Sequence, residues 1–332
     1  MDSLTQIVLG AAVGEAVLGR KIGNKAMLYG AIAGTIPDLD ILASNFTDTV
    51  NALEIHRGFT HSIFFAVIFA PLFGWLVSRW ERAASWKSWS WLFFWGLFTH
   101  PLLDGFTTWG TQLFWPLDIR LAFKSIFVID PLYTLPFLTF LILTMRQKRT
   151  SLKRKRYNQL GLLISSLYLV LGLVLKGLAF QQFEKNLETQ KINYFAIETK
   201  PTPFNTILWT ANVDTPTEYL IGHYSFFDSQ PIQFTAYSKN HEKLGTLKTT
   251  DKIKQLIKIS KGWYTITEEN GELYFNDLRF GLMRLDPKAE NFVFSYKIEA
   301  LENGTIKVTE KEKNPRDGKA LLKDLWQRIG GN

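Results

Sequence analysis

Long apolar runs dominate the chain up to about residue 181, and beyond that point the sequence turns polar, charged and short in hydrophobic period. Six of these runs approach the length of about 20 residues with which a helix spans a bilayer. The runs cover residues 4–19, 26–43, 62–80, 89–108, 127–145 and 159–180. This pattern predicts a polytopic α-helical membrane domain of about five or six apolar helices over residues 1–182, followed by a mostly β domain over residues 185–332.

The runs differ in how well they suit a bilayer. The first two are short and rich in Gly and Ala, which suits close helix packing but leaves partial insertion open. The fourth ends in His100 and Asp104, so part of it must face protein or water. Asp2 and the lack of a positive n-region indicate that the first run is retained rather than cleaved as a signal peptide.

The distribution of Lys and Arg predicts the orientation of these helices. Thirteen cations lie in the connections on one side, seven of them between residues 146 and 156, whereas three lie on the other side, Arg57, Arg120 and Lys124. The side richer in cations is expected in the cytoplasm. We therefore expect a multi-pass protein of the inner membrane, with residues 185–332 on the extracytoplasmic side. Membrane anchoring also accounts for the net charge of +8, so lipid rather than nucleic acid is the expected partner, and the oligomeric state is left open.

The polar part of the chain carries the pattern of a β domain. Residues 263–266 and 272–275 predict a hairpin whose turn is Asn270-Gly271. Other β-rich runs bounded by turn residues lie at residues 195–198, 207–210, 218–221 and 292–296. A charged amphipathic pattern near residues 316–328 predicts a closing helix.

Ionisable residues of metal-binding type interrupt the apolar part of the chain. Cysteine is absent, so His, Asp and Glu are the strong ligands that remain. Such residues within apolar sequence need a functional or structural reason. The candidates are Glu15, Asp38, Asp40, His56, Arg57, His61, His100 and Asp104. Their imidazole and carboxylate groups suit Zn²⁺ or a similar divalent metal.

Spacing ranks the histidines. In a helix, His100 and Asp104 share a face and can reach one ion; the alternative is a helix cap or a hydrogen-bonded polar pair within the bundle. His56 and His61 are five residues apart, about 140° around a helix, so a helix could not point both at one ion, and Gly58 favours a loop. His61 adjoins the next helix and is the better ligand. His56 could bind a second ion, act as an acid or base, or cap a loop.

The remaining candidates admit more than one interpretation. Asp38 and Asp40 follow Pro37, and a dication would relieve the repulsion between their carboxylates; a helix-terminus role is the alternative. Arg57 could clamp a phosphate or anchor the chain at the membrane interface. Glu15 could serve as a general base or support a ligand, or could simply face water. His223 and His241 have no acidic neighbour at ligand spacing and are left out of the site.

Four motifs resemble one known family. They are Met1-Asp2-Ser3-Leu4-Thr5-Gln6, Pro37-Asp38-Leu39-Asp40, His56-Arg57-Gly58-Phe59-Thr60-His61-Ser62 and His100-Pro101-Leu102-Leu103-Asp104. In content and order they are similar to those of the YdjM-like family of membrane-bound metal-dependent hydrolases, over roughly residues 1–180. Many relatives have His where this chain has Gln6, which departs from the family pattern. The resemblance implies hydrolysis but names no substrate.

A looser likeness is to the zinc-dependent phospholipase C group, whose metal ions are held by an Asp, a His and a His-x-x-x-Asp pair. That likeness implies one four-ligand centre formed by Asp38 or Asp40 with His61, His100 and Asp104. The later histidines and glutamate that hold further zinc ions in that group have no counterpart here. A three-metal site is therefore not expected.

Together these features predict a membrane-bound, metal-dependent hydrolase that cuts a lipid or lipid-linked phosphoester at the outer face of the membrane by metal-activated water. Asp38, Asp40, His61, His100 and Asp104 are the predicted ligands. His56 or Glu15 is the expected proton carrier, and Arg57 is expected near a phosphate. The alternative is a metal-stabilised membrane scaffold or a transporter without hydrolytic activity.

Overall fold

The computed structural model of the chain describes residues 1–285, 291–301, 305–313 and 315–332. The fold divides into two compact units. Unit 1 comprises Met1–Asn45, Ile55–Val174 and Pro203–Asn205, and unit 2 comprises Phe46–Glu54, Leu175–Thr202 and Thr206–Asn332. The division at residues 182–185, expected from composition, stays a prediction.

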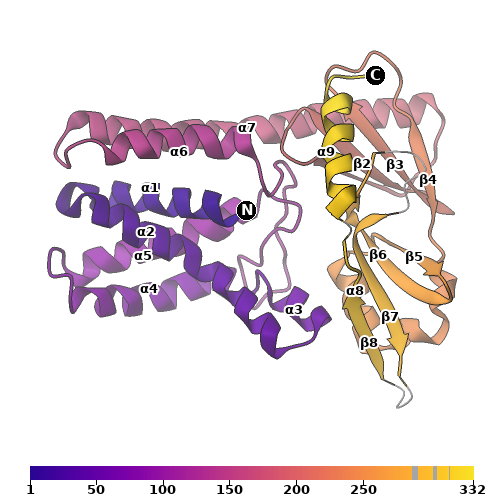
Figure 1. Cartoon of the computed structure of the whole chain (residues 1–332), viewed down its shortest axis with the longest axis horizontal. Helices are drawn as coiled ribbons and strands as arrows, with labels where there is room; N and C mark the ends of the chain where they lie inside the picture. The colour runs from indigo at the N-terminus through magenta and orange to yellow at the C-terminus, as the bar shows by residue number, and fades with distance from the viewer. Residues whose placement is uncertain (286–290, 302–304, 314) are drawn as a thin grey trace. The chain divides into compact units, whose positions relative to one another are not determined.

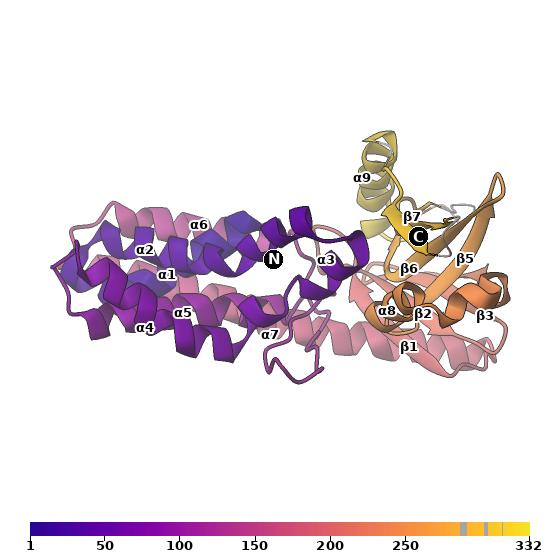
Figure 2. The ribbon, with the colours of Figure 1, turned by 90° about the horizontal axis from the view of Figure 1, so that it is seen from below.

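Unit 1 is helical, and in Figure 1 and Figure 2 its helices α1, α2, α4 and α5 run side by side. Its elements are α1 (Ser3–Ile22), α2 (Asn24–Thr35), the 3₁₀ helices η1 (Ile36–Phe46) and η2 (Phe59–His61), α4 (Ile63–Ser78), α5 (Trp86–Asp104), α6 (Pro131–Met145) and the first part of α7 (Leu152–Thr189). Side-chain caps fix several helix starts: Ser62 caps α4, Ser85 caps α5 and Asp130 caps α6.

Glycines bring α1 and α2 into close contact, as the Gly- and Ala-rich composition of the first two runs predicts. A Cβ atom on Gly14 would lie 2.1 Å from the carbonyl oxygen of Ala26, and one on Gly30 would lie 2.2 Å from the carbonyl oxygen of Gly10. The two backbones therefore touch where a side chain would keep them apart. This packing fixes the end of α2, from which η1 leads directly to Asp38.

The expectation of five or six membrane-spanning helices is wrong. Within the described residues, α7 is long and apolar enough to cross a membrane, and a second span results only if Thr49–His61 and Ile63–Ser78, bent by 61° at their break, count as one. Helices α2, α4 and α6 have 12, 16 and 15 residues. At 1.5 Å per residue they reach at most about 24 Å, short of the ~30 Å hydrocarbon core. Helices α1 and α5 are longer, but their Gly, Ala and polar residues lower their mean hydropathy.

Unit 2 contains two four-stranded antiparallel sheets, with strand orders β1-β2-β3-β4 and β5-β6-β7-β8. The mostly β character expected for the polar part is confirmed. The strands are β1 (Ala196–Pro201), β2 (Leu208–Asp214), β3 (Glu218–Ser225), β4 (Phe234–Ser238), β5 (Tyr264–Glu269), β6 (Glu272–Leu282), β7 (Phe292–Ala300) and β8 (Ile306–Glu310). The predicted hairpin is β5–β6, where Asn270 and Gly271 both have positive φ, 53° and 80°, as a two-residue turn of this kind requires.

Short helices complete unit 2. They are α3 (Thr49–Ile55), of which all but the last residue belongs to unit 2, the 3₁₀ helix η3 (His241–Thr249), α8 (Asp251–Ile259) and α9 (Pro315–Ile329), the last at the position that the amphipathic pattern predicts. The end of α7 also belongs here, because Ala179 and Phe183 are buried in one core with Trp209 and Ala211 of β2. Helix α7 therefore changes surroundings along its length, from unit 1 to unit 2.

Candidate metal centre

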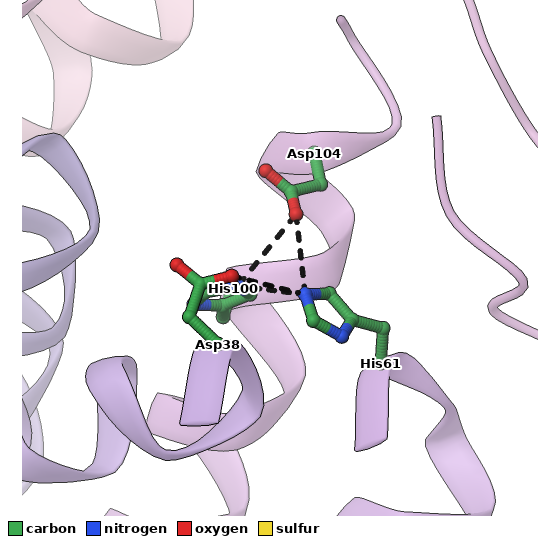
Figure 3. A group of neighbouring side chains, drawn as sticks. All are labelled: Asp38, His61, His100 and Asp104. Carbon is green, nitrogen blue, oxygen red and sulfur yellow. Dashed lines mark hydrogen bonds and ion pairs between the residues drawn. The ribbon is translucent and has the colours of Figure 1, made fainter. Parts of the chain in front are cut away.

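Four side chains from three segments of unit 1 converge on one point (Figure 3). Asp38 comes from η1, His61 ends η2, and His100 and Asp104 lie on one face of α5. One potential ligand atom from each side chain lies within 4.8 Å of the others. Three of the four side chains are buried, and Asp38 is 22% exposed.

Five of the six distances within this cluster are close to those around a small tetrahedral ion, and the sixth, between the carboxylate oxygens of Asp38 and Asp104, is at most 4.8 Å. The Nε2 atoms of His61 and His100 are 3.1 Å apart. Oδ1 of Asp38 lies 3.4 and 3.3 Å from these two atoms, and Oδ2 of Asp104 lies 3.4 and 3.6 Å from them. Ligand bonds of about 2.0–2.1 Å in a tetrahedron place the ligand atoms about 3.3 Å apart. The four side chains therefore fit Zn²⁺ or a similar divalent cation.

The outer hydrogen bonds of both imidazoles support the same conclusion. Nδ1 of His100 donates to the carbonyl oxygen of Gly34 at 2.6 Å, and Nδ1 of His61 lies 3.1 Å from Oγ1 of Thr60 and 3.3 Å from Oδ2 of Asp40. With the proton on Nδ1, each Nε2 directs a lone pair into the cluster. Metal-binding histidines are commonly held in this way by a carbonyl or carboxylate.

The Asp104 side chain is fully buried. Burial raises the pKa of its carboxyl group, but the Arg57 guanidinium, the amino group of Met1 and the two histidines outweigh that effect and hold the pKa well below its usual range. Oδ2 lies 3.1 Å from Nε of Arg57, yet it accepts no hydrogen bond from any described residue. A buried anionic oxygen in that state is suited to bind a cation.

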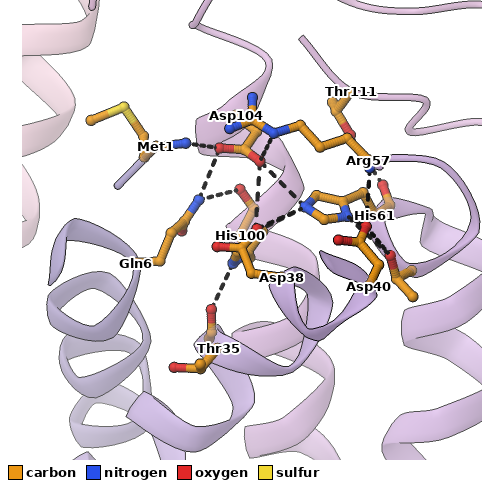
Figure 4. Close-up of polar contacts among 12 residues, drawn as sticks. Met1, Gln6, Thr35, Asp38, Asp40, Arg57, His61, His100, Asp104 and Thr111 are labelled. Carbon is orange, nitrogen blue, oxygen red and sulfur yellow. Dashed lines mark hydrogen bonds and ion pairs between the residues drawn. The ribbon is translucent and has the colours of Figure 1, made fainter. Parts of the chain in front are cut away.

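Asp40 stands beside the cluster rather than in it (Figure 4). Its carboxylate accepts hydrogen bonds from Nδ1 of His56 at 2.9 Å, the backbone N–H of Arg57 at 3.0 Å and Oγ1 of Thr60 at 2.9 Å. The side chain of His56 is 32% exposed. Asp40 therefore ties His56 to the segment that carries His61.

Arg57 is enclosed by protein groups. Its side chain is 6% exposed, and besides the contact to Asp104 it donates to Oγ1 of Thr107 at 3.1 Å. Its backbone has a positive φ of 63°, and its carbonyl oxygen accepts from the N–H of Gln112 at 3.1 Å. Arg57 thus balances the charge of Asp104 and joins two loops around the cluster.

Glu15 lies in a different environment. Its carboxylate pairs with the Arg154 guanidinium through two hydrogen bonds of 2.7 and 2.5 Å, and both side chains are buried. No atom of Glu15 belongs to the ligand group found among the described residues. The structure therefore does not bring Glu15 together with the other candidates.

Sequence reasoning gave no role to two groups that contact the ligands. Nε2 of Gln6 donates to Oδ1 of Asp104 at 3.0 Å and to the carbonyl oxygen of His100 at 3.3 Å, and the amino group of Met1 also contacts Asp104. The signal for Gln6 was its place in the first of the four motifs. In this chain Gln6 supports a ligand.

Comparison with known proteins places this cluster in a family context. Residues 1–179, which contain every residue of the cluster, match the model of a family described as YdjM inner membrane protein. The chain belongs to this family. The resemblance expected from the four motifs is confirmed, and a membrane location is supported with it.

One curated relative of this YdjM-family chain is the inner membrane protein YbcI of Escherichia coli (strain K12). The two are 31% identical over 112 residues, which is 34% of this chain and 64% of the relative, so less than two thirds of the relative is covered. No solved structure matches the chain. The region beyond residue 179, which holds both β-sheets, lies outside the family match.

Proposed function

We propose that this YdjM-family protein is a membrane-bound hydrolase that depends on a divalent metal, Zn²⁺ by its donor set. The observation that carries the proposal is the convergence of two imidazole nitrogens and two carboxylate oxygens, all within 4.8 Å of one another. Of the four side chains, Asp38 is partly exposed, which gives the centre an open side. Four protein ligands fill a tetrahedron, so water would reach the ion from this side as a fifth ligand, a coordination number that catalytic zinc can adopt.

A bound divalent cation supplies a hydrolytic water of lowered pKa and polarises the bond to be cut. The protein contributes the surrounding groups. His56, whose Nδ1 is held by Asp40 and whose ring is partly exposed, is positioned to carry a proton. Arg57 keeps the Asp104 carboxylate ionised, and since its side chain is enclosed by protein groups, its predicted place near a phosphate stays a prediction.

Exposed apolar side chains next to the centre favour a lipid or lipid-linked phosphoester as the substrate. Leu39, Ile41 and Leu42 of η1 are all exposed directly after Asp38. Phe114 and Leu117 are exposed on the loop that hydrogen bonds to the backbone of Arg57 and Ile63. An apolar rim of this kind suits the acyl or prenyl part of a lipid, whereas the ion would hold its polar part.

The proposed orientation rests on α7. Apolar side chains such as Leu163, Leu167 and Val170 are exposed along it, as expected for contact with lipid, and the cations of residues 146–156 favour a cytoplasmic start. Unit 2 would then be extracytoplasmic. The outer side is also the one that the sequence predicts for the segments that carry the ligands.

The test is hydrolysis by the purified full chain, with Zn²⁺ bound and after removal of metal, of bis(p-nitrophenyl) phosphate and of vesicles made from a panel of phospholipids. We expect hydrolysis only with metal, and none by the His100→Ala variant. The His241→Gln variant, changed in unit 2, should keep full activity. Hydrolysis that survives both chelation and His100→Ala would contradict the proposal, as would a metal-loaded protein inactive on every substrate.

The second candidate function is that of a metal-stabilised scaffold. It is favoured by the number of protein ligands, because four are present and His61, His100 and Asp104 are all buried, as in closed structural zinc sites. In that case the ion would hold η1, η2 and α5 together. Chelation would then lower the thermal stability of unit 1 in a protein that hydrolyses nothing.

A further inference from the structure

Helix α3 occupies a special place in the sequence, because the chain runs from ligand Asp38 through α3 to ligand His61. Both ligands belong to unit 1, as do Asp40 and His56. The intervening segment Phe46–Glu54 belongs to unit 2. The middle of the segment between Asp38 and His61 therefore belongs to the C-terminal unit, while its two ends supply ligands of the metal centre.

Apolar packing holds α3 in unit 2. Val50 is fully buried in one core with Ile253 and Leu256 of α8 and with Tyr264 of β5, and Leu53 packs against the same core. These partners lie more than 200 positions further along the chain. The buried residue of α3, Val50, is thus packed against residues of the C-terminal unit.

Polar contacts follow the same helix along its length. Nε2 of Gln255 donates to Oδ1 of Asn51 at 3.2 Å and also contacts the Glu54 carboxylate. Nζ of Lys258 lies 3.5 Å from Oε1 of Glu54, and Nζ of Lys252 lies 3.7 Å from Oδ2 of Asp48. All three side chains come from α8. They contact Asp48 directly before α3, Asn51 in the middle of α3 and Glu54 near its end.

Asp40 connects the chain before α3 to the chain directly after it. Its carboxylate binds Nδ1 of His56 and the backbone N–H of Arg57, the residues that follow α3 directly. Asp40 is two residues from ligand Asp38, and its contact to Nδ1 reaches ligand His61. A displacement of α3 would therefore be transmitted along the chain to the two segments that Asp40 joins, and these segments carry the ligands Asp38 and His61.

The element between Asp38 and α3 also needs support. Eleven residues form η1, whereas 3₁₀ helices seldom exceed three or four residues because their hydrogen bonds are poorly aligned. One end of η1 continues from α2 in unit 1, and its other end, Phe46, begins the segment that belongs to unit 2. The element that follows the second end of η1, after two residues, is α3, so the packing of α3 bears on the segment that carries Asp38.

We propose that the C-terminal β unit positions the metal centre by binding α3, so that Val50 and Leu53 act as positioning residues for Asp38 and His61. This role rests on the metal site of the proposed function but not on hydrolysis. It gives a purpose to the region beyond the family match. The unit acts as a brace for the segment that joins two ligands.

The test is titration of the metal-free full chain with Co²⁺, which reports both affinity and ligand geometry through its visible spectrum, together with amide exchange of α3 and of strands β2 and β3. Val50→Asp should release α3, weaken Co²⁺ binding at least tenfold and alter the spectrum, while β2 and β3 stay protected. The conservative variant Val50→Ile should bind Co²⁺ as the wild type does. Phe46→Asp is the matched control, because Phe46 is 91% exposed in the same segment.

A charge exchange tests the same contact without a buried charge. Glu54→Lys should weaken Co²⁺ binding about twofold to fivefold, and adding Lys258→Glu should restore it, since an exposed ion pair contributes little. Wild-type Co²⁺ binding by a Val50→Asp variant whose α3 exchanges freely would overturn the positioning role alone. Failure of the charge exchange to restore binding would also contradict it. Absence of Co²⁺ binding by the wild type would overturn the metal centre and this role together.

Discussion

The Nε2 atoms of His61 and His100 face each other at 3.1 Å, although the two residues come from different segments of the chain. Neither ring is free to turn, because the Nδ1 atoms are engaged by Asp40 and Thr60 in one case and by the carbonyl oxygen of Gly34 in the other. Two imidazole lone pairs this close repel each other in the absence of a cation. The pair is therefore the strongest single indication of a metal ion.

Asp104 and Asp40 should respond differently to the loss of charge. Asp104→Asn removes the negative charge of a ligand and should abolish stoichiometric Zn²⁺ binding, measured by elemental analysis after dialysis. Asp40→Asn leaves all four ligand atoms and should weaken affinity by about 10- to 100-fold, as is usual for an outer partner of a metal-bound histidine. Equal loss of zinc in both variants would show that Asp40 is itself a ligand.

The sequence predicts the parts of the site that depend on local geometry. The four-residue spacing of His100 and Asp104 places both on one face of α5, where the structure has them. Both Asp38 and Asp40 were predicted as ligands, whereas the structure has Asp38 in the cluster and Asp40 beside it. In the 3₁₀ helix η1, residues two apart point about 120° away from each other, so one carboxylate can face the ion while the other faces His56. No pattern in the sequence predicts a 3₁₀ helix of 11 residues.

The sequence patterns predicted neither the long-range partners of buried residues nor the lengths of the helices. Glu15 resembled a functional acid because its partner, Arg154, lies 139 residues away among cations interpreted as membrane anchors. The apolar runs suggested more spans than the structure supports, since hydropathy alone does not reveal that α4 and α6 stop at 16 and 15 residues. Similarly, no composition argument could place α3 in the C-terminal unit, because that depends on tertiary packing.

Close packing of α1 on α2 predicts a strong response to one added methyl group. In Gly14→Ala, the new Cβ would meet the carbonyl oxygen of Ala26 at 2.1 Å, so the helices must move apart and stability should fall by about 1–3 kcal/mol. Gly177→Ala is the matched control, since a Cβ there has no described atom within 4 Å, and it should be neutral or stabilising by up to about 1 kcal/mol. Thermal unfolding in detergent measures both, and equal melting temperatures would refute the close packing.

The Glu15 and Arg154 pair predicts a structural effect without a change in metal content. Glu15→Gln leaves a buried guanidinium without its counter-charge, which should cost about 3–5 kcal/mol of stability. Glu81→Gln, which breaks the exposed pair with Lys25, should cost less than about 1 kcal/mol. Bound zinc should remain at the wild-type level in both variants. Loss of zinc in Glu15→Gln, in protein that remains folded, would instead link Glu15 to the metal centre.

His223 makes the stability of unit 2 depend on pH. Burial, then the charges of Arg328 and Lys200, lowers the pKa of His223 from its ordinary 6.5 to about 4, while its Nδ1 lies 3.0 Å from Oγ1 of Thr210. Between these two values the unfolded state binds the proton and the folded state does not, so acid favours unfolding. Stability should be full above pH 6.5, fall by about 1–3 kcal/mol as the pH drops toward 4, and change no further through this group. Opening free energies of β2 and β3 from amide exchange, corrected for the intrinsic exchange rate, measure the effect. His223→Gln should flatten this profile, and an unchanged slope in that variant would assign the pH dependence to other groups.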